Sequence, residues 1–284
     1  MAQFKNYATL TYSGGTSNSN TVTGELLPVL AATKTAVMDD YTPKDSVTYV
    51  LSLVNTGAKA LTGLTVTDDL GAYAFGGNTL YPLAYTNGSL RCYINGVLQT
   101  PAPTVTVGPP LVITNLHIPA EGNLLLIYEA AVTPYAPLGI DATITNTATI
   151  TGGDLCRTVT ATETIGMAVR PELSISKALC PATVTECGQI TYTFVIENLG
   201  AVAASAGDNV VLTDTFTPIL NPIAVTLNDV TWSEGNQYTY NPLTGQFATN
   251  LGKITVPAAA YTQKPDGTWA ITPGTATLTI TGTI

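Results

Sequence analysis

The chain is poor in charge and especially poor in basic residues. Of its 284 residues, 10 are Lys or Arg and 19 are Asp or Glu, which gives a formal net charge of −9. So few cations, spread over the whole chain, cannot form the basic stripe that binds nucleic-acid phosphates. We therefore expect no nucleic-acid partner. A weakly charged surface rich in Thr instead favours a protein that packs against copies of itself.

Long apolar runs are also missing, although hydrophobic residues make up 45% of the sequence. None of the runs approaches the roughly 18 residues that a membrane-spanning helix needs, so no transmembrane segment is expected. The N-terminus, MAQFKNYATLTYSGG, has no basic stretch followed by an apolar one, and no secretory signal is visible. Two explanations stay open. The chain is a trimmed mature form, or it leaves the cell by another route, such as lysis of the mother cell in a sporulating bacterium.

Side chains typical of catalytic and metal sites are scarce. The one histidine, His117, stands alone, and no GxSxG, HExxH or P-loop pattern occurs. None of the four cysteines belongs to a CxxC pair, so a zinc site is not expected. From the sequence we predict that the chain is not an enzyme and that it binds no cofactor or metal.

The cysteines bear instead on disulfides. Cys180 and Cys187 bracket the short segment PATVTE. A disulfide between them would close a small loop and contribute roughly 2–3 kcal/mol by the chain-entropy estimate. Two buried free thiols are the alternative. Cys92 and Cys156 pair within one domain, pair between subunits or stay free, and the sequence does not decide among these.

The chain is rich in the residues of β-strands. Val, Ile, Thr and Tyr are frequent, and these side chains fit pleated, half-buried surfaces. The segments VTYVLSLV (47–54) and ITYTFVI (190–196) alternate apolar and other residues with the period of a half-buried strand. The length suits two domains with a core each. We predict an all-β fold of two immunoglobulin-like β-sandwich domains.

The two halves of the chain repeat each other. A lysine opens each copy, a Tyr-bearing strand follows at the same spacing, and that strand ends in Asn-x-Gly, a turn signal. Both copies then reach a Thr-Asp pair after further alternating apolar residues. The matched positions are Lys34, Tyr49, Asn55 and Asp68 in the first copy and Lys177, Tyr192, Asn198 and Asp214 in the second.

The last hairpin of the first copy has its counterpart at the N-terminus. Residues 123–132 match residues 275–284, after which only the first copy continues. The segment NYATLTYSGG resembles NTATITGGD, with Asn6, Ala8 and Thr9 at the positions of Asn146, Ala148 and Thr149. We therefore predict a donor hairpin in residues 1–27, a first domain in 28–166, and an incomplete second domain in 167–284.

A cut repeat of this kind favours a polymer. An open sheet edge is a template for pairing, and a free hairpin is at best marginally stable alone. We predict that residues 4–27 of one subunit complete the second domain of the next by β-strand addition. Such a head-to-tail contact grows into a filament unless it closes a ring. A hairpin packed on its own chain is the alternative. The predicted donor side chains are Phe4, Tyr7, Leu10, Tyr12, Val22 and Leu26.

At these residues the chain resembles a repeat family of bacterial and archaeal surface proteins, the domain of unknown function eleven. The resemblance lies in the opening Lys, the Tyr-rich strand that ends in Asn-x-Gly, the Thr-Asp strand end and the final Asn-x-Ala strand. It covers residues 30–166 as one copy and residues 170–284 with 4–27 as a second copy in permuted order. It implies an immunoglobulin-like fold at a cell or spore surface, and it implies no activity.

Three matched polar residues, Lys34, Asp68 and Asn146, are similar to the Lys, acid and Asn of surface-pilin domains that form an internal isopeptide bond. That chemistry needs a neutral amine and a protonated carboxyl, and burial favours both. The alternative is an exposed Lys, a strand-end Asp and a turn-forming Asn. By the permutation, the second set is Lys177, Asp214 and Asn6 of a neighbouring subunit.

The sequence thus predicts a structural subunit of a self-assembling extracellular or spore-surface filament. Its partners are copies of itself, and isopeptide cross-links between them are a further expectation. The alternative is a monomeric adhesion or carbohydrate-binding module of a larger surface protein. Under that alternative the second domain is stable without residues 1–27.

Overall fold

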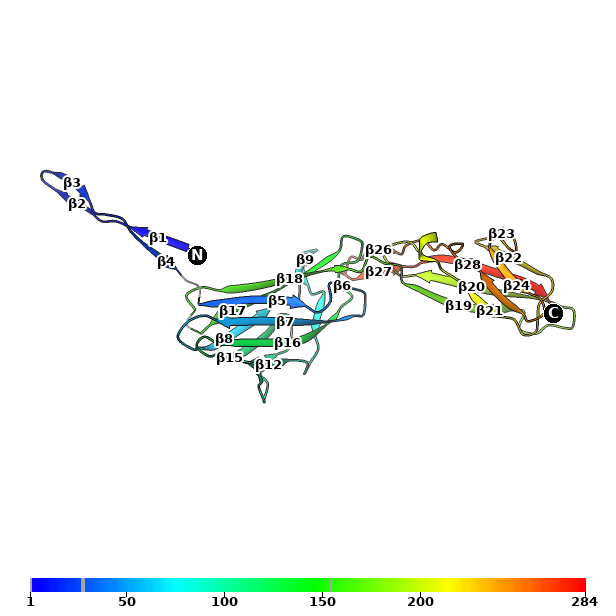
Figure 1. The fold of residues 1–284 in the computed structure, drawn as a ribbon, viewed down its shortest axis with the longest axis horizontal. Helices are drawn as coiled ribbons and strands as arrows, with labels where there is room; N and C mark the ends of the chain where they lie inside the picture. Colours follow the sequence, from blue (N-terminus) through cyan, green and yellow to red (C-terminus); the bar gives the residue numbers. More distant parts are fainter. Residues whose placement is uncertain (1, 27–28, 154) are drawn as a thin grey trace.

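The fold is built of β-strands throughout. The computed structural model describes residues 2–26, 29–153 and 155–284, and within these ranges the only helical element is η1 (Ala206–Asp208), one short 3-10 turn. The all-β prediction is confirmed. Figure 1 shows three parts in chain order: a long two-stranded hairpin, a first sandwich and a second sandwich. No helix in the described ranges is long and apolar enough to span a bilayer.

The N-terminal hairpin, residues 2–26, contains two successive pairs of antiparallel strands. β1 (Ala2–Asn6) pairs with β4 (Val22–Leu26), and β2 (Thr9–Tyr12) pairs with β3 (Gly15–Asn18). Among the described residues these four strands pair only with one another. In Figure 1 the hairpin projects away from both sandwiches.

The first sandwich consists of two six-stranded sheets. The first sheet has the order β13-β12-β16-β7-β5, with β11 also paired to β16, and the second has the order β14-β15-β8-β17-β18-β6. A small hairpin of β9 and β10 lies outside both sheets. The strands are β5 (Leu30–Ala36), β6 (Asp40–Tyr41), β7 (Ser46–Asn55), β8 (Leu61–Asp68), β9 (Tyr73–Phe75), β10 (Asn78–Leu80), β11 (Leu83–Tyr85), β12 (Arg91–Ile94), β13 (Val97–Leu98), β14 (Thr104–Thr106), β15 (Leu111–Ile118), β16 (Asn123–Val132), β17 (Thr143–Gly152) and β18 (Val159–Met167).

The core of the first sandwich follows from strand alternation. In β7, every second residue from Val47 to Leu53 is buried, which confirms the half-buried strand predicted there. β16 and β17 alternate in the same way. Because successive side chains point to opposite faces, each strand contributes one row to the space between the sheets. The same rule aims a few polar residues inward, and these form the candidate site.

The second sandwich has a five-stranded sheet in the order β19-β20-β28-β22-β23 and a three-stranded sheet in the order β21-β25-β24. Its core is separate and includes Phe194, Phe216, Phe247 and Leu278. The strands are β19 (Leu173–Cys180), β20 (Gln189–Asn198), β21 (Thr213–Thr215), β22 (Ile223–Leu227), β23 (Val230–Trp232), β24 (Tyr238–Asn241), β25 (Gln246–Thr249), β26 (Ala260–Gln263), β27 (Trp269–Thr272) and β28 (Gly274–Thr283).

The two sandwiches share the Asn-x-Gly turn that the sequence repeats. The side chain of Asn55 accepts from the backbone N–H of Gly57 and donates to two carbonyls. Asn198 does the same with Gly200 and two carbonyls at matching positions. Both asparagines are buried. Leu30 lies opposite Asn55 in the first sandwich and Leu173 lies opposite Asn198 in the second, so the two copies can be compared strand by strand.

One hairpin of the second repeat packs on the first sandwich. The N–H of Trp269 in β27 donates to the carbonyl of Pro134 at 2.9 Å. The amide of Gln263 in β26 donates to the Tyr73 hydroxyl at 3.0 Å. Trp269 and Tyr261 also pack against the core of the first sandwich. This hairpin therefore attaches the second repeat to the first sandwich through both backbone and side-chain contacts.

Candidate functional site

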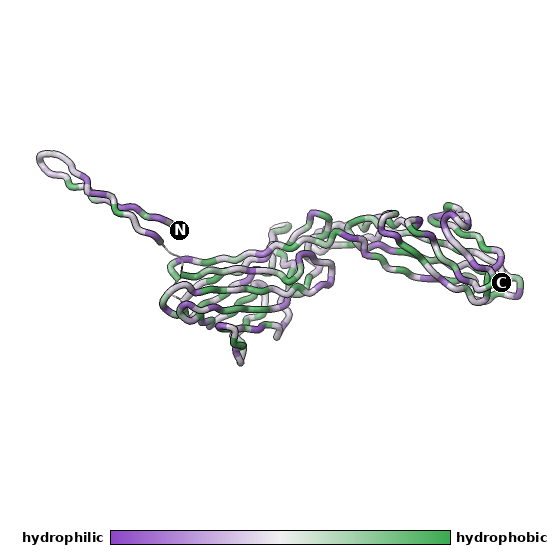
Figure 2. Tube along the Cα trace, in the orientation of Figure 1, coloured by the Kyte–Doolittle hydropathy of each residue, from purple (hydrophilic) through white to green (hydrophobic). Residues whose placement is uncertain are grey.

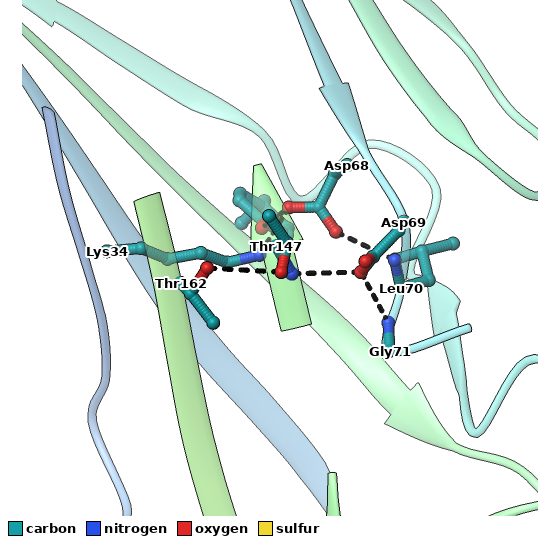
Figure 3. A network of polar contacts seen from close by, with 8 residues as sticks. Lys34, Asp68, Asp69, Leu70, Gly71, Thr147 and Thr162 are labelled. Carbon is teal, nitrogen blue, oxygen red and sulfur yellow. Dashed lines mark hydrogen bonds and ion pairs between the residues drawn. The ribbon is translucent and has the colours of Figure 1, made fainter. Parts of the chain in front are cut away.

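A lysine and an aspartate are buried together in the first sandwich. Lys34 in β5 places its Nζ 2.6 Å from Oδ2 of Asp68 at the end of β8, and the two side chains are 0% and 1% exposed. Figure 3 shows Lys34 reaching toward Asp68. The hydroxyl of Tyr128 donates to the same oxygen, and the N–H of Leu70 donates to Oδ1. The structure thus brings together two of the three residues predicted for cross-linking.

Burial alters the acid–base behaviour of this cluster. Loss of solvent lowers the pKa of the Lys34 amine from its ordinary value of 10.5, although the carboxylate of Asp68 acts in the opposite direction. Burial also raises the pKa of the Tyr49 and Tyr128 hydroxyls, which keeps both protonated as donors. A buried lysine with a lowered pKa is more often neutral, and a neutral amine is a nucleophile.

Asn146, the third predicted residue, is completely buried in β17. It lies two residues before Ala148, which is opposite Asp68 in the pairing of β17 with β8. The amide is close enough to the Tyr49 and Tyr128 hydroxyls to offset part of the rise in their pKa. Asn146 therefore belongs to the same buried cluster as the Lys34–Asp68 pair.

The polar atoms of this asparagine are poorly satisfied. Within the described residues, neither Nδ2 nor Oδ1 of Asn146 has a partner in hydrogen-bond geometry, and neither does the hydroxyl of Tyr49. Buried polar side-chain atoms nearly always have a partner, and each orphan costs about 1–3 kcal/mol. The arrangement is an amine with a lowered pKa, a carboxyl group and an unpartnered amide. The amine and the amide are the reactants of amide formation with loss of ammonia, and the carboxyl group is placed to carry the proton.

Asp69 holds the backbone of β17 at Thr147, the residue that follows Asn146. The carboxylate of Asp69 accepts from the N–H of Thr147 and from that of Gly71, both at 2.9 Å (Figure 3). The N–H of Asp69 in turn donates to the carbonyl of Thr147. These bonds hold β17 against the end of β8, where Asp68 lies.

Two tyrosines of this cluster were not among the predicted site residues. Tyr49 and Tyr128 lie opposite each other in the pairing of β7 with β16, with stacked rings 5.8 Å apart. The alternation in NLLLIYEAAV does place Tyr128 on the inward face. Its contact with Asp68 crosses from one sheet to the other, and no local pattern shows that.

The second sandwich repeats the pair without the burial. Nζ of Lys177 in β19 lies 2.5 Å from Oδ2 of Asp214 in β21, and these side chains are 41% and 18% exposed. The ammonium sits over the ring of Tyr192, 4.6 Å from its centroid. Ile280 lies opposite Tyr192 and takes the place that Tyr128 has in the first sandwich. The pair is formed, but one side of it is open.

The open side corresponds to the place of β17 and β18. In the first sandwich β8 pairs with β15 on one edge and β17 on the other, whereas the matching strand β21 pairs in the described chain with β25 alone. β18 packs beside β5, but every residue of the matching strand β19 is exposed. Leu173 is 39% exposed, whereas Leu30 at the same position of β5 is 4% exposed.

The hairpin at the N-terminus carries unburied apolar side chains. Hydrophobic positions recur along it in Figure 2. The predicted donor residues whose side chains are described are 57% to 66% exposed, and they are Phe4, Tyr7, Leu10, Tyr12 and Val22. The side chain of Leu26 lies outside the described residues. Asn6 is also exposed, so in its own chain the hairpin brings no amide to either lysine.

The remaining predicted residues do not gather into a site. Cys92 is buried, and Cys156, Cys180 and Cys187 are exposed, with no disulfide among them in the structure. The disulfide between Cys180 and Cys187 stays a prediction, and its alternative of buried thiols does not fit their exposure. His117 is exposed on β15. No group of three or more His, Cys, Asp or Glu in the described part of the chain could hold a metal ion.

Comparison with known proteins gives likeness in structure only. No family model and no curated protein matches the chain, so the resemblance to the surface-protein repeat stays a resemblance. Solved structures similar to it include the pilus backbone (RrgB) of Streptococcus pneumoniae, at 11% identity and a TM-score of 0.35 over 86% of this chain and 55% of that one. The full-length major pilin SpaD of Corynebacterium diphtheriae has 14% identity and a TM-score of 0.37 over 86% and 59%.

A third similar structure is the collagen-binding domain of a Staphylococcus aureus adhesin, at 12% identity and a TM-score of 0.31 over 49% of this chain and 99% of that one. At this level of likeness the neighbours do not assign a function to this chain. The function has to come from the geometry of its own site.

Proposed function

We propose that the chain is the structural subunit of an extracellular filament, at a cell or spore surface, in which the N-terminal hairpin of one copy completes the second sandwich of the next. The observation that supports this is the match between two incomplete parts. Among the described residues the hairpin pairs with no strand outside itself and exposes its apolar residues, and the second sandwich has an open edge at β21 beside the exposed strand β19.

The first sandwich supplies the register for this contact. There Ala148 lies opposite Asp68, and β17 and β18 form the covering hairpin. With Ala8 opposite Asp214, the alternate residues of the donor hairpin take inward positions that are buried in the first sandwich. On this register Phe4, Asn6 and Leu10 replace Ile144, Asn146 and Ile150. Tyr7 replaces Thr147 on the outer face, so it contributes at the rim.

The apolar side chains of the hairpin contribute to the proposed contact between subunits. Each donor side chain that becomes buried contributes about 1.5–3 kcal/mol, so Phe4 and Leu10, which take buried positions on this register, give roughly 3–6 kcal/mol before costs. Ordering the segment and losing free motion offset much of this gain. The contact joins two different surfaces of the same chain, and repetition of such a contact produces a filament unless the rotation closes a ring.

The order of parts across the new joint is the same as the order inside the chain. In the first sandwich β18 ends at Met167, and the chain enters the second sandwich at Leu173. In the hairpin β4 ends at Leu26, and the chain enters the first sandwich at Leu30. A completed second sandwich is therefore followed by the next subunit's first sandwich, as the first sandwich is followed by the second.

Within the first sandwich, the same proposal includes an internal amide bond between Lys34 and Asn146. The neutral amine adds to the amide carbon, Nδ2 takes up a proton and leaves as ammonia, and Asp68 carries the proton. The bond removes the unpartnered Nδ2 and the buried amine together. It would make the first sandwich resistant to extension along the filament.

Negative-stain electron microscopy of the purified chain, with and without residues 2–26, tests the filament. The full chain should form filaments and the shortened chain should form none. Circular dichroism should show that the shortened chain keeps its β-structure, because neither core contains the hairpin. Filaments from the shortened chain, or a full chain that stays a single copy at all concentrations, would contradict the proposal. The second outcome would favour a monomeric adhesion or carbohydrate-binding module.

A further inference from the structure

We propose that docking of the hairpin also starts a reaction, in which Lys177 of one subunit forms an amide bond with the side chain of Asn6 from its neighbour. The filament would then be covalent along its length. This inference rests on the proposed function, because Asn6 reaches Lys177 only when the hairpin of another copy is in place.

The acceptor half of this reaction site is already assembled. The Lys177–Asp214 distance of 2.5 Å matches the Lys34–Asp68 distance of 2.6 Å in the buried site. The two pairs differ in burial, since both residues of the first pair are enclosed and both of the second are partly exposed to solvent. In the first sandwich the cover is the β17–β18 hairpin, and the same hairpin supplies Asn146. One docking event therefore supplies both the missing amide and the missing cover.

Burial of the Lys177–Asp214 pair under the hairpin would change its protonation. A buried ion pair loses the solvation of both charges, and this cost favours transfer of the proton from the ammonium to the carboxylate. The neutral pair that results is the pair the reaction needs. In the open subunit water solvates both groups, so Lys177 should stay inert until assembly. The bond is thus confined to subunits that are correctly docked.

The chemical step balances without any further reactant. The lone pair of Nζ of Lys177 adds to Cγ of Asn6, while the carboxyl group of Asp214 donates to Oδ1. A proton passes from Nζ to Nδ2, the Cγ–Nδ2 bond breaks, and ammonia leaves. Asp214 ends with the proton it started with. An amine and a primary amide have become a secondary amide and ammonia.

The site formed by Lys177, Asp214 and the neighbour's Asn6, the composite site, would contain fewer carboxylates than the site in the first sandwich. The negative charges of Asp69 and Glu163 both favour the protonated form of Lys34 and raise its pKa. Thr215 follows Asp214 where Asp69 follows Asp68. Val22 lies opposite Asn6, whereas Glu163 lies opposite Asn146. The composite site therefore keeps the carboxylate of Asp214 and lacks counterparts of the carboxylates of Asp69 and Glu163. Without those two negative charges, the lysine amine would be easier to deprotonate.

The test is to boil wild-type filaments in SDS and to measure masses of the cross-linked peptides. We expect a ladder of covalent multimers, and a peptide pair joining Lys177 to Asn6 that has lost one ammonia. Asn6→Ala and Lys177→Met filaments should still form under the microscope and should dissociate to single chains on boiling.

The outcomes separate the two proposals. Wild-type filaments that boil to single chains would overturn the covalent bond and leave the docking contact intact. A ladder that persists in Asn6→Ala would also overturn it. An absence of wild-type filaments would overturn the filament itself.

A matched pair of variants at Val22 tests the charge argument separately. Val22→Glu restores the carboxylate that the first sandwich has at this place, and Val22→Gln adds a side chain of similar size without charge. At neutral pH the Glu variant should form the ladder several times more slowly than the Gln variant, at equal filament yield. A Glu variant that reacts as fast or faster would contradict the role assigned to the missing carboxylate.

Discussion

At the scale of single residues, the main contrast is between two chemically matched pairs in different surroundings. Lys34 and Asp68 are enclosed and lie beside an asparagine whose polar atoms are unpartnered. Lys177 and Asp214 have the same separation and an open side. Under the proposed contact, the hairpin of a neighbouring copy supplies to the second site what β17, β18 and Asn146 supply to the first.

Asn146→Ala should leave the Lys34 amine free, and intact mass measures this. Intact mass should equal the sequence mass in the variant and should be lower by one ammonia in the wild type. Thr145→Ala, at the exposed neighbouring position of β17, should keep the loss of ammonia. A wild-type chain with its full sequence mass would contradict the internal bond.

The same variant should gain a pH dependence of stability. The folded pKa of Lys34 is lowered, and its unfolded value is the ordinary 10.5. Between these two values the unfolded chain binds more protons, so the free energy of unfolding rises with pH, by at most about 1.4 kcal/mol per pH unit. Urea unfolding of Asn146→Ala should therefore show more stabilisation from neutral pH to about pH 9.5 than the wild type. Equal slopes would contradict a titratable buried amine.

Lys34, Asp68 and Asn146 could be chosen as candidates from the sequence, because each has a matched residue in the repeat and lies on a predicted strand. The roles of Tyr49 and Tyr128 could not be predicted, because they depend on which strands of the two sheets face each other. The aligned repeats show that the second copy has Ile280 at the position of Tyr128. Only the structure shows that the second pair therefore lacks the tyrosine hydroxyl that contacts the aspartate in the first.

At the scale of elements, the donor hairpin has two unlike faces. On the proposed register, Leu10 takes the position of Ile150, which is buried, and Thr11 takes that of Thr151, which is exposed. Both residues are exposed in their own chain. Substitutions here act on the contact between subunits and should leave the fold of each subunit unchanged.

Leu10→Asp should weaken assembly, because it removes a buried apolar side chain and places a charge in the neighbour's core. A loss of about 3 kcal/mol corresponds to a roughly 100-fold higher critical concentration. Thr11→Asp is the matched control and should assemble like the wild type. Light scattering across a concentration series measures both. Equal effects of the two variants would contradict the proposed faces.

Regular alternation made the long strands predictable, as at β7 and β20, whose inward residues follow a period of two. The β26–β27 hairpin was not predicted. Its side chains Tyr261 and Trp269 pack on the other sandwich, so their pattern reflects a tertiary contact and not a half-buried strand of their own domain. The short strands β9 to β14 also lack a sufficient local pattern.

At the scale of the whole molecule, the exposed hairpin lies at one end of the chain, and the second sandwich, with its open edge at β21, lies at the other (Figure 1). The β26–β27 hairpin fixes the first sandwich to the second through Trp269 and Gln263. The first sandwich has no such hairpin between β15 and β16. The proposed acceptor face at β19 and β21 belongs to the second sandwich, which is the part distant from the chain's own hairpin in Figure 1.

A mixing experiment with two incomplete subunits tests the central claim most directly. One subunit lacks residues 2–26 and so has an acceptor but no donor. The other carries Leu173→Asp on the exposed strand β19 and so has a donor but an impaired acceptor. Analytical ultracentrifugation should find each alone as a monomer and their mixture as a one-to-one dimer that grows no further. A mixture that stays monomeric while the wild type forms filaments, or a Leu173→Asp subunit that polymerises alone, would contradict docking of the hairpin in the second sandwich.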